Sequence, residues 1–256
     1  PRVHALVQHA LAQSPEIGIH TSSVNVLVGE TNDSYLNDLQ GRHVRAEHVF
    51  MALRNAASGP VLEGAVGAAT GTMCYGWKGG IGTASRRLAD IGGFTLGALV
   101  QTNFGRSPDL TIAGVPVGKS LQPPTVLADT PKDKGSVMIV LASDAPLDSR
   151  QLHRLCVRAA AGLARTGSMY GHGSGDFVIA FSTAQTLGHD APPLVVQRNY
   201  LPDEAAMDVL FRAVAETVAE AVYNALCAAR TVTGRDGHLG HALPMADAAA
   251  LVQKFY

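Results

Sequence analysis

A small polar pair followed by an uninterrupted apolar run constrains this chain more than any other stretch. Gly135 and Ser136 lead directly into residues 137–142, which are apolar, rich in β-branched side chains and bounded by turn formers. This pattern predicts a strand buried on both faces, with the Ser136 hydroxyl held rigidly where the strand begins. Gly135 has no Cβ, so the carbonyl before Ser136 is open to close approach.

A serine in that position could attack the peptide bond before it. Once freed, Ser136 would carry both a nucleophilic Oγ and an α-amino group. The simpler interpretation is that the Gly-Ser pair is ordinary turn chemistry at the start of a strand. The local pattern leaves both interpretations open.

Composition narrows the classes of partner. The chain has 256 residues, 46% of them hydrophobic, which suffices for the core of a single domain. Its 20 basic and 21 acidic residues form no long block of one sign. We therefore expect no nucleic-acid partner and no anionic membrane surface, and a small neutral substrate or a peptide fits better.

The sequence indicates no metal site and no cofactor site. Cys74, Cys156 and Cys227 are widely spaced, which predicts core fillers and no disulfide framework or zinc site. His238 and His241 have no Cys or carboxylate cluster beside them. The glycine-rich stretch 59–118 fits neither a P-loop nor a dinucleotide-binding loop, because glycines required by each motif are missing.

Neither a signal peptide nor a membrane span is indicated. The first residues lack a charged stretch followed by an apolar core, and no apolar run reaches the ~20 residues that a membrane helix needs. A cytoplasmic location is favoured on these grounds.

Hydrophobic periodicity predicts a chain with both helices and strands. The longest helix falls at 203–229, and Asp148 with Gln151 fits a capping box that starts another helix, ending near Gly167. Residues 119–135 are expected to form an exposed, cleavable loop, and 233–241 a glycine-rich loop. The remaining helices are predicted at 3–13, 46–57 and 245–255, and strands at 24–33, 94–101, 137–142 and 177–181.

Polar residues near the predicted strand ends are the further candidates for a site. Asn103 could direct its amide at a developing oxyanion, or it could simply shape the turn before Gly105. Ser174 and Asp176 would share a sheet end with Ser136 if the two strands pair. His172 is a possible general base that nothing local orients, and Glu30 could equally be a solvated turn carboxylate.

Taken together and in order, several segments resemble the L-aminopeptidase/D-esterase family, which includes the β-aminopeptidases. The match runs from about residue 20 to the C-terminus. Its segments are Val28-Gly29-Glu30-Thr31, Tyr35-Leu36-Asn37-Asp38, Lys78-Gly79-Gly80-Ile81-Gly82-Thr83-Ala84-Ser85-Arg86, Gln101-Thr102-Asn103-Phe104-Gly105, Gly114-Val115-Pro116-Val117-Gly118, Gly135-Ser136 through Asp144-Ala145-Pro146-Leu147, Gly173-Ser174-Gly175-Asp176, Ala180-Phe181-Ser182-Thr183 and Glu220-Ala221-Val222-Tyr223-Asn224-Ala225-Leu226.

The resemblance implies an α/β fold, a four-layer αββα sandwich. It implies a single domain over 1–256 that cuts itself between Gly135 and Ser136, giving subunits 1–135 and 136–256. Ser136 would form an ester with the substrate's acyl group, and water would resolve it. The resemblance also implies a homo-oligomer, expected to be a tetramer.

Site roles carry over residue by residue. Ser174 and Asp176 match the positions that orient and activate the nucleophile, and Asn103 matches the oxyanion-stabilising asparagine. Glu30 is a candidate to hold the substrate's free ammonium. The chain departs from the family at Asp176, where members usually carry the longer Glu. Family precursors also have a substantial segment before the position of Pro1, so the sequence is either incomplete or that of a truncated relative.

The function predicted from the resemblance is a self-processing serine aminopeptidase. It would release N-terminal residues, including β- or D-amino acids, from short peptides, amides and esters. One alternative is an acyltransferase of similar architecture that passes the acyl group to an amine. The other is a scaffold relative that keeps the fold and has lost catalysis.

Overall fold

The computed structural model describes residues 2–14, 16, 17, 19, 24–124, 135–186, 201 and 204–256. Their fold is α/β, with one main sheet and a layer of helices against it. The helices are α1 (Arg2–Gln13), α2 (Ala46–Arg54), α3 (Ser149–Arg165), α4 (Glu204–Ala228) and α5 (Met245–Gln253). The strands are β1 (Met73–Cys74), β2 (Trp77–Lys78), β3 (Ile81–Leu88), β4 (Phe94–Asn103), β5 (Ser136–Ser143), β6 (Gly175–Ser182), β7 (Val232–Thr233) and β8 (Leu239–Gly240).

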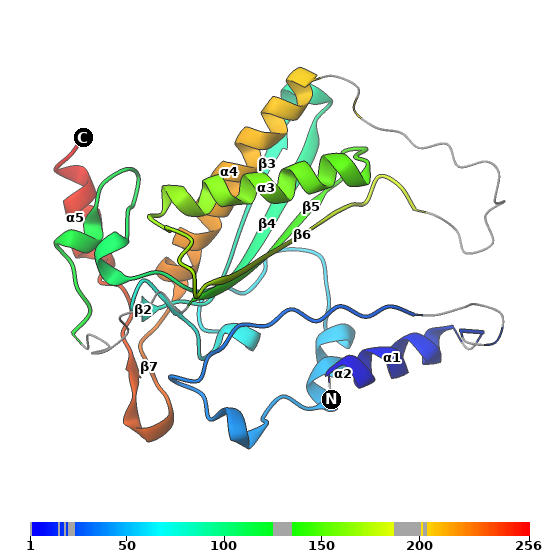
Figure 1. Ribbon diagram of the computed structural model, residues 1–256, viewed down its shortest axis with the longest axis horizontal. Helices are drawn as coiled ribbons and strands as arrows, with labels where there is room; N and C mark the ends of the chain where they lie inside the picture. Colours follow the sequence, from blue (N-terminus) through cyan, green and yellow to red (C-terminus); the bar gives the residue numbers. More distant parts are fainter. Residues whose placement is uncertain are drawn as a thin grey trace.

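The main sheet has four strands in the order β3-β4-β5-β6. The first two pairs are antiparallel, whereas β5 and β6 are parallel and α3 connects them. Consequently the end of β4 and the starts of β5 and β6 meet at one edge of the sheet (Figure 1). The strand that begins at Ser136 therefore pairs with the strand that follows Ser174. This pairing is the condition on which Ser174 and Asp176 were expected to share a sheet end with Ser136.

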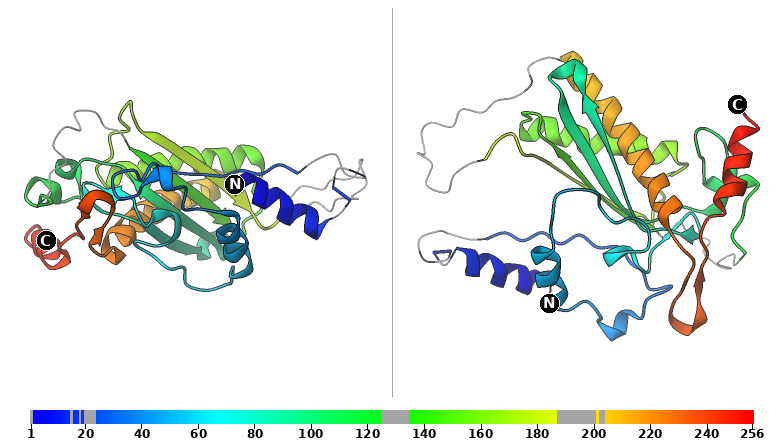
Figure 2. Two further views of the ribbon diagram at one scale, coloured as in Figure 1. Left: turned by 90° about the horizontal axis from the view of Figure 1, so that it is seen from below. Right: turned by 180° about the vertical axis from the view of Figure 1, so that it is seen from behind.

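Helices α3 and α4 lie side by side on one face of this sheet (Figures 1 and 2). Alternate residues of the central strands point into the helical layer, as the two-residue period of a strand requires. Among them, Val100, Ile139 and Leu141 are at most 1% exposed. The buried stripe of α4 completes this core, as its periodicity predicts: Met207, Leu210, Val214, Val218, Val222 and Leu226.

The opposite face of the sheet is only partly covered. On β6, Phe177 is 63% and Phe181 46% exposed, and Val140 of β5 is partly exposed. The prediction that the strand after Ser136 is buried on both faces is therefore only partly right: the helices bury one face, whereas on the other Met138 is buried but Val140 and Ala142 are partly exposed.

An extended segment, residues 24–33, runs past the end of the sheet where β4 finishes and β5 begins (Figure 1). Gly29 lies so close to Met138 that an added Cβ would be 2.5 Å from its Cε, and the Gln101 amide donates to Thr31 Oγ1 at 2.7 Å. The strand predicted here is wrong: the segment is extended, but within the described residues it joins no ladder. Side chains of the sheet hold it instead.

Most of the predicted helices are confirmed, including α3 with its Asp148–Gln151 capping box. Strand β3 was not predicted, and residues 233–241 form much of the β7–β8 hairpin where a loop was expected. The expected loop 119–135 lies largely outside the described residues, since 125–134 are not described. Of the three cysteines predicted to fill the core, only Cys74 is buried, whereas Cys227 is exposed.

Across the described part of the chain, no helix combines the length and apolarity that crossing a membrane requires.

Candidate active site

Ser136 is the first residue of β5 and lies between two neighbouring strands. It pairs with Asn103 of β4 on one side and with Gly175 of β6 on the other. Val137, the next residue, is fully buried beneath the helices, whereas Ser136 is only partly buried. The alternation of the strand thus directs the hydroxyl to the sheet face that the helices do not cover.

The amide of Asn103 is a direct hydrogen-bond partner of the nucleophile candidate. Its Nδ2 donates to Ser136 Oγ at 3.2 Å and to the carbonyl oxygen of Asn32 at 2.7 Å. The N–H of Met73 donates to Asn103 Oδ1 at 3.3 Å. A backbone N–H can only donate and a carbonyl can only accept, so these partners fix which end of the amide faces Ser136.

The carbonyl of Gly135, which would be the scissile one, is also held. Gly175 N–H donates to Gly135 O at 2.9 Å, as part of the β5–β6 pairing. An N–H aimed at that oxygen would stabilise negative charge developing on it. The structure therefore supplies separate donors for the Gly135 oxygen and for the Ser136 hydroxyl.

Ser174 and Asp176 form a hydrogen-bonded pair beside Gly135. Ser174 Oγ donates to Asp176 Oδ1 at 2.8 Å, and a Cβ added to Gly135 would be 3.2 Å from Ser174 Oγ. The shorter aspartate carboxylate thus reaches Ser174. The pair sits against the residue before the predicted cut, and the direct contact with Ser136 comes from Asn103.

The turn that leads into β6 brings an aromatic hydroxyl near this pair. Burial, and secondarily the charge of Asp176, raise the pKa of Tyr170. Tyr170 also adopts a left-handed backbone with φ 51°, which is uncommon for a residue with a side chain. His172, the candidate general base, is exposed in the same turn.

Glu30 lies on the extended segment, two residues before Asn32. Its Oε2 is 2.5 Å from Arg2 Nη2, and the Glu30 side chain is 67% exposed. The carboxylate is thus accessible and already attracts a cation, on the segment whose next residues bind Gln101 and Asn103.

Sequence reasoning missed the groups that orient Asn103. Two of them, the Asn32 carbonyl and the Met73 N–H, are backbone atoms that no residue type reveals. Sequence reasoning also gave no role to the buried Lys78 nearby, which left one signal: a lysine between Trp77 and two glycines in a stretch with few other charges.

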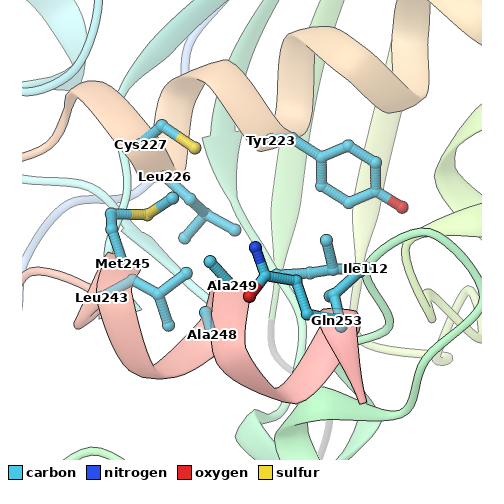
Figure 3. A pocket seen from close by; sticks show the side chains of 10 residues that line it. Ile112, Tyr223, Leu226, Cys227, Leu243, Met245, Ala248, Ala249 and Gln253 are labelled. Carbon is cyan, nitrogen blue, oxygen red and sulfur yellow. The ribbon is translucent and has the colours of Figure 1, made fainter. Parts of the chain in front are cut away.

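An apolar pocket of about 320 Å³ lies elsewhere, between the C-terminal part of α4 and α5 (Figure 3). Its lining includes Tyr223, Leu226 and Met245 and none of the residues grouped around Ser136. Among the described residues, no three His, Cys, Asp or Glu side chains form a group that could hold a metal ion.

Comparison with known proteins places the chain in a family. The model of Peptidase family S58 matches residues 2–240. The β-peptidyl aminopeptidase BapA of Sphingosinicella microcystinivorans is 42% identical over 243 residues, which cover 90% of this chain and 61% of that protein. The chain thus spans about three-fifths of the length of the curated relatives it matches.

Solved structures with a similar fold point to the same family. A protein of Pyrococcus horikoshii has a TM-score of 0.89 at 46% identity, covering 99% of this chain and 69% of its own. The L-aminopeptidase D-Ala-esterase/amidase of Ochrobactrum anthropi has a TM-score of 0.88 at 39% identity, covering 98% of this chain and 69% of its own. That enzyme is described as a prototype of the serine aminopeptidases and a variant of the Ntn hydrolase fold, in agreement with the predicted layered α/β sandwich. The chain belongs to Peptidase family S58.

Proposed function

We propose that this chain carries the self-processing and catalytic centre of a serine aminopeptidase. The observation that carries the proposal is the position of Ser136. It begins a central strand directly after a glycine, with its Oγ 3.2 Å from the Asn103 amide and the preceding carbonyl on the Gly175 N–H. These contacts support a role for Ser136 as the nucleophile and for the two N–H donors as oxyanion stabilisers.

Self-processing would begin with attack of Ser136 Oγ on the Gly135 carbonyl carbon. The new C–O bond forms as the C–N bond breaks, and the nitrogen, taking up a proton, becomes the α-amino group of Ser136. Gly175 N–H would stabilise the oxyanion in this step. Water then hydrolyses the ester, leaving a Gly135 carboxylate and subunits 1–135 and 136–256 of one domain.

Turnover would use the same hydroxyl on a substrate. The freed α-amino group, with an ordinary pKa of ~7.7–8.0, is a suitable base near neutral pH and can accept the Ser136 proton. Oγ forms an ester with the substrate's acyl carbon, the amine leaves with a proton, and water releases the acid. Asn103 would stabilise the tetrahedral oxyanion. The Ser174–Asp176 pair would orient the new chain end at Ser136.

The proposed substrates are short peptides, amides or esters with a free N-terminal amine, of an α- or β-amino acid. The names of the relatives support this class, since they include β-peptidyl aminopeptidases and an L-aminopeptidase D-Ala-esterase/amidase. Glu30 would bind the substrate's ammonium. Its present ion pair with Arg2 shows that a cation can reach the carboxylate.

Intact-protein mass spectrometry tests the proposal first. We expect two fragments whose masses sum to the chain plus one water, with Ser136 as a new N-terminus. The Ser136→Ala variant should give one uncut chain and no release of p-nitroaniline from L-alanine or β-alanine p-nitroanilide. Turnover by the Ser136→Ala variant would show that another residue is the nucleophile.

Acyl transfer remains the alternative within the same chemistry. Adding a primary amine during turnover separates the two: a transferase yields the new amide, whereas a hydrolase yields the free acid. An uncut, inactive full-length protein would instead favour the scaffold. A homotetramer and a cytoplasmic location stay predictions, and light scattering of the purified full-length protein tests the first.

A further inference from the structure

A buried lysine lies next to the site without a part in the proposed reaction. Lys78 of β2 is 0% exposed, and its Nζ donates to the carbonyl oxygens of Ala69, Thr72 and Gly79 at 3.1, 2.8 and 2.7 Å. These acceptors match the three donors of an ammonium. A buried charge is costly unless it is fully hydrogen-bonded, so this arrangement holds the three carbonyls firmly together.

Burial also lowers the pKa of Lys78 to about 8, while the nearby Cys74 and Asp33 act in the opposite direction. Keeping Lys78 charged in the folded chain therefore costs free energy, and the hydrogen bonds to its three carbonyl partners offset that cost.

The carbonyls belong to the two backbone segments that flank Asn103. On one side, Thr72 immediately precedes Met73, whose N–H donates to Asn103 Oδ1 at 3.3 Å. On the other, Gly79 precedes Gly80, whose N–H donates to Thr102 Oγ1 at 2.9 Å. Thr102 is the residue before Asn103. Lys78 thus ties together the two backbone segments that contact Thr102 and Asn103.

We propose that Lys78 is a positioning residue that fixes the amide of Asn103 for oxyanion stabilisation at Ser136. The link runs from the ammonium through the Thr72 carbonyl to the Met73 N–H, which selects Oδ1 as its partner and leaves Nδ2 facing Ser136 Oγ. The inference rests on the proposed function, because it assigns Asn103 a catalytic task.

The first test is Lys78→Met, which keeps the length of the side chain and removes its donors. We expect kcat per cleaved chain to fall about tenfold to a hundredfold, the range expected when a catalytic group shifts by up to about an ångström. KM should stay within about twofold, because the oxyanion contact forms in the transition state. The exposed Lys254→Met is the matched control and should leave both constants unchanged.

A double-mutant cycle with Asn103→Ala separates positioning from a general structural role. If Lys78 acts through Asn103, adding Lys78→Met to Asn103→Ala should lower kcat less than about threefold further. If the loss of kcat in the double variant equals the product of the losses in the two single variants, Lys78 acts independently of the amide and the proposal is overturned.

Folding is monitored by circular dichroism of each variant. Lys78→Gln, which keeps two N–H donors without the charge, replaces Lys78→Met if the latter does not fold, and it should show the same non-additivity. If neither variant folds, Lys78 is a residue for stability of the whole fold and the proposal is wrong. An inactive wild type would refute the proposed function, whereas an active wild type with additive effects refutes the role of Lys78 alone.

Discussion

At the scale of single residues, the hydrogen bond between Ser174 and Asp176 is the most informative contact outside the nucleophile. Asp176 accepts from Ser174 Oγ at 2.8 Å, and Ser174 lies against Gly135. A hydrogen bond to a carboxylate is stronger than one to a neutral amide. Its charge, more than its length, should therefore keep Ser174 in place.

Asp176→Asn should accordingly lower kcat about tenfold, since replacing a charged acceptor by a neutral one forfeits roughly 1 to 2 kcal/mol. Asp176→Glu restores the residue usual in the family and keeps the charge, so it should retain activity within about threefold. Steady-state hydrolysis of an amino acid p-nitroanilide measures both. Full activity of Asp176→Asn would mean that the Ser174–Asp176 hydrogen bond only stabilises the turn and has no part in catalysis.

At the scale of elements, α4 approaches the sheet as closely as it does because β3 carries a glycine beneath it. A Cβ added to Gly82 would overlap the carbonyl oxygen of Ala221 and crowd the N–H of Ala225, both in the backbone of α4. Gly97 of β4 is the opposite case, since an added Cβ would have its nearest neighbours at 4.0 Å.

Gly82→Ala should therefore lower the free energy of unfolding by about 1 to 3 kcal/mol, the usual cost of overpacking a core. Gly97→Ala is the matched control and should change that free energy by less than about 1 kcal/mol, in the stabilising direction. Urea unfolding of both in the uncut Ser136→Ala background makes the comparison. Equal losses of unfolding free energy in the two variants would mean that α4 can shift away from Gly82 at little cost.

The same glycine explains why β3 could not be predicted from the sequence. Residues 81–88 contain glycine, serine and two arginines, a composition that favours no strand, and their place in the sheet depends on contacts with α4. By contrast, α3 and α4 carry complete local signals, a capping box and a long apolar stripe. Residues 24–33 had strand composition and no ladder in the described structure, since composition cannot specify a partner.

At the scale of the whole molecule, the sequence placed Ser174 and Asp176 near Ser136 only on condition that their strands pair, and it did not predict what orients the side chains there. Ser136, Asn103 and the Ser174–Asp176 pair converge because the end of β4 and the starts of β5 and β6 meet, and it is the structure that supplies this pairing. The Met73 N–H, the Asn32 carbonyl and Lys78 entered only through the folded backbone. Hydrogen-bond direction is a property of the fold.

Lys78 also makes the stability of the molecule depend on pH. Its pKa falls from an ordinary 10.5 to about 8 in the folded chain. Above pH 8 the folded state therefore binds fewer protons at Lys78 than the unfolded state, so stability rises with pH. This contribution is complete above 10.5 and absent well below 8. Burial raises the pKa of the Cys74 thiol from 9.0 to about 12, which lowers stability above pH 9.

The window from pH 8 to 9 isolates the lysine. In the uncut Ser136→Ala background, the free energy of unfolding with Lys78 present should rise by about 1 kcal/mol over that window relative to the Lys78→Met chain. Groups common to both chains cancel in the difference, including the N-terminal amine. Urea unfolding at the two pH values measures it. A difference that stays constant or shrinks would mean that Lys78 remains charged in the fold well above pH 8, with its three carbonyls outweighing its burial.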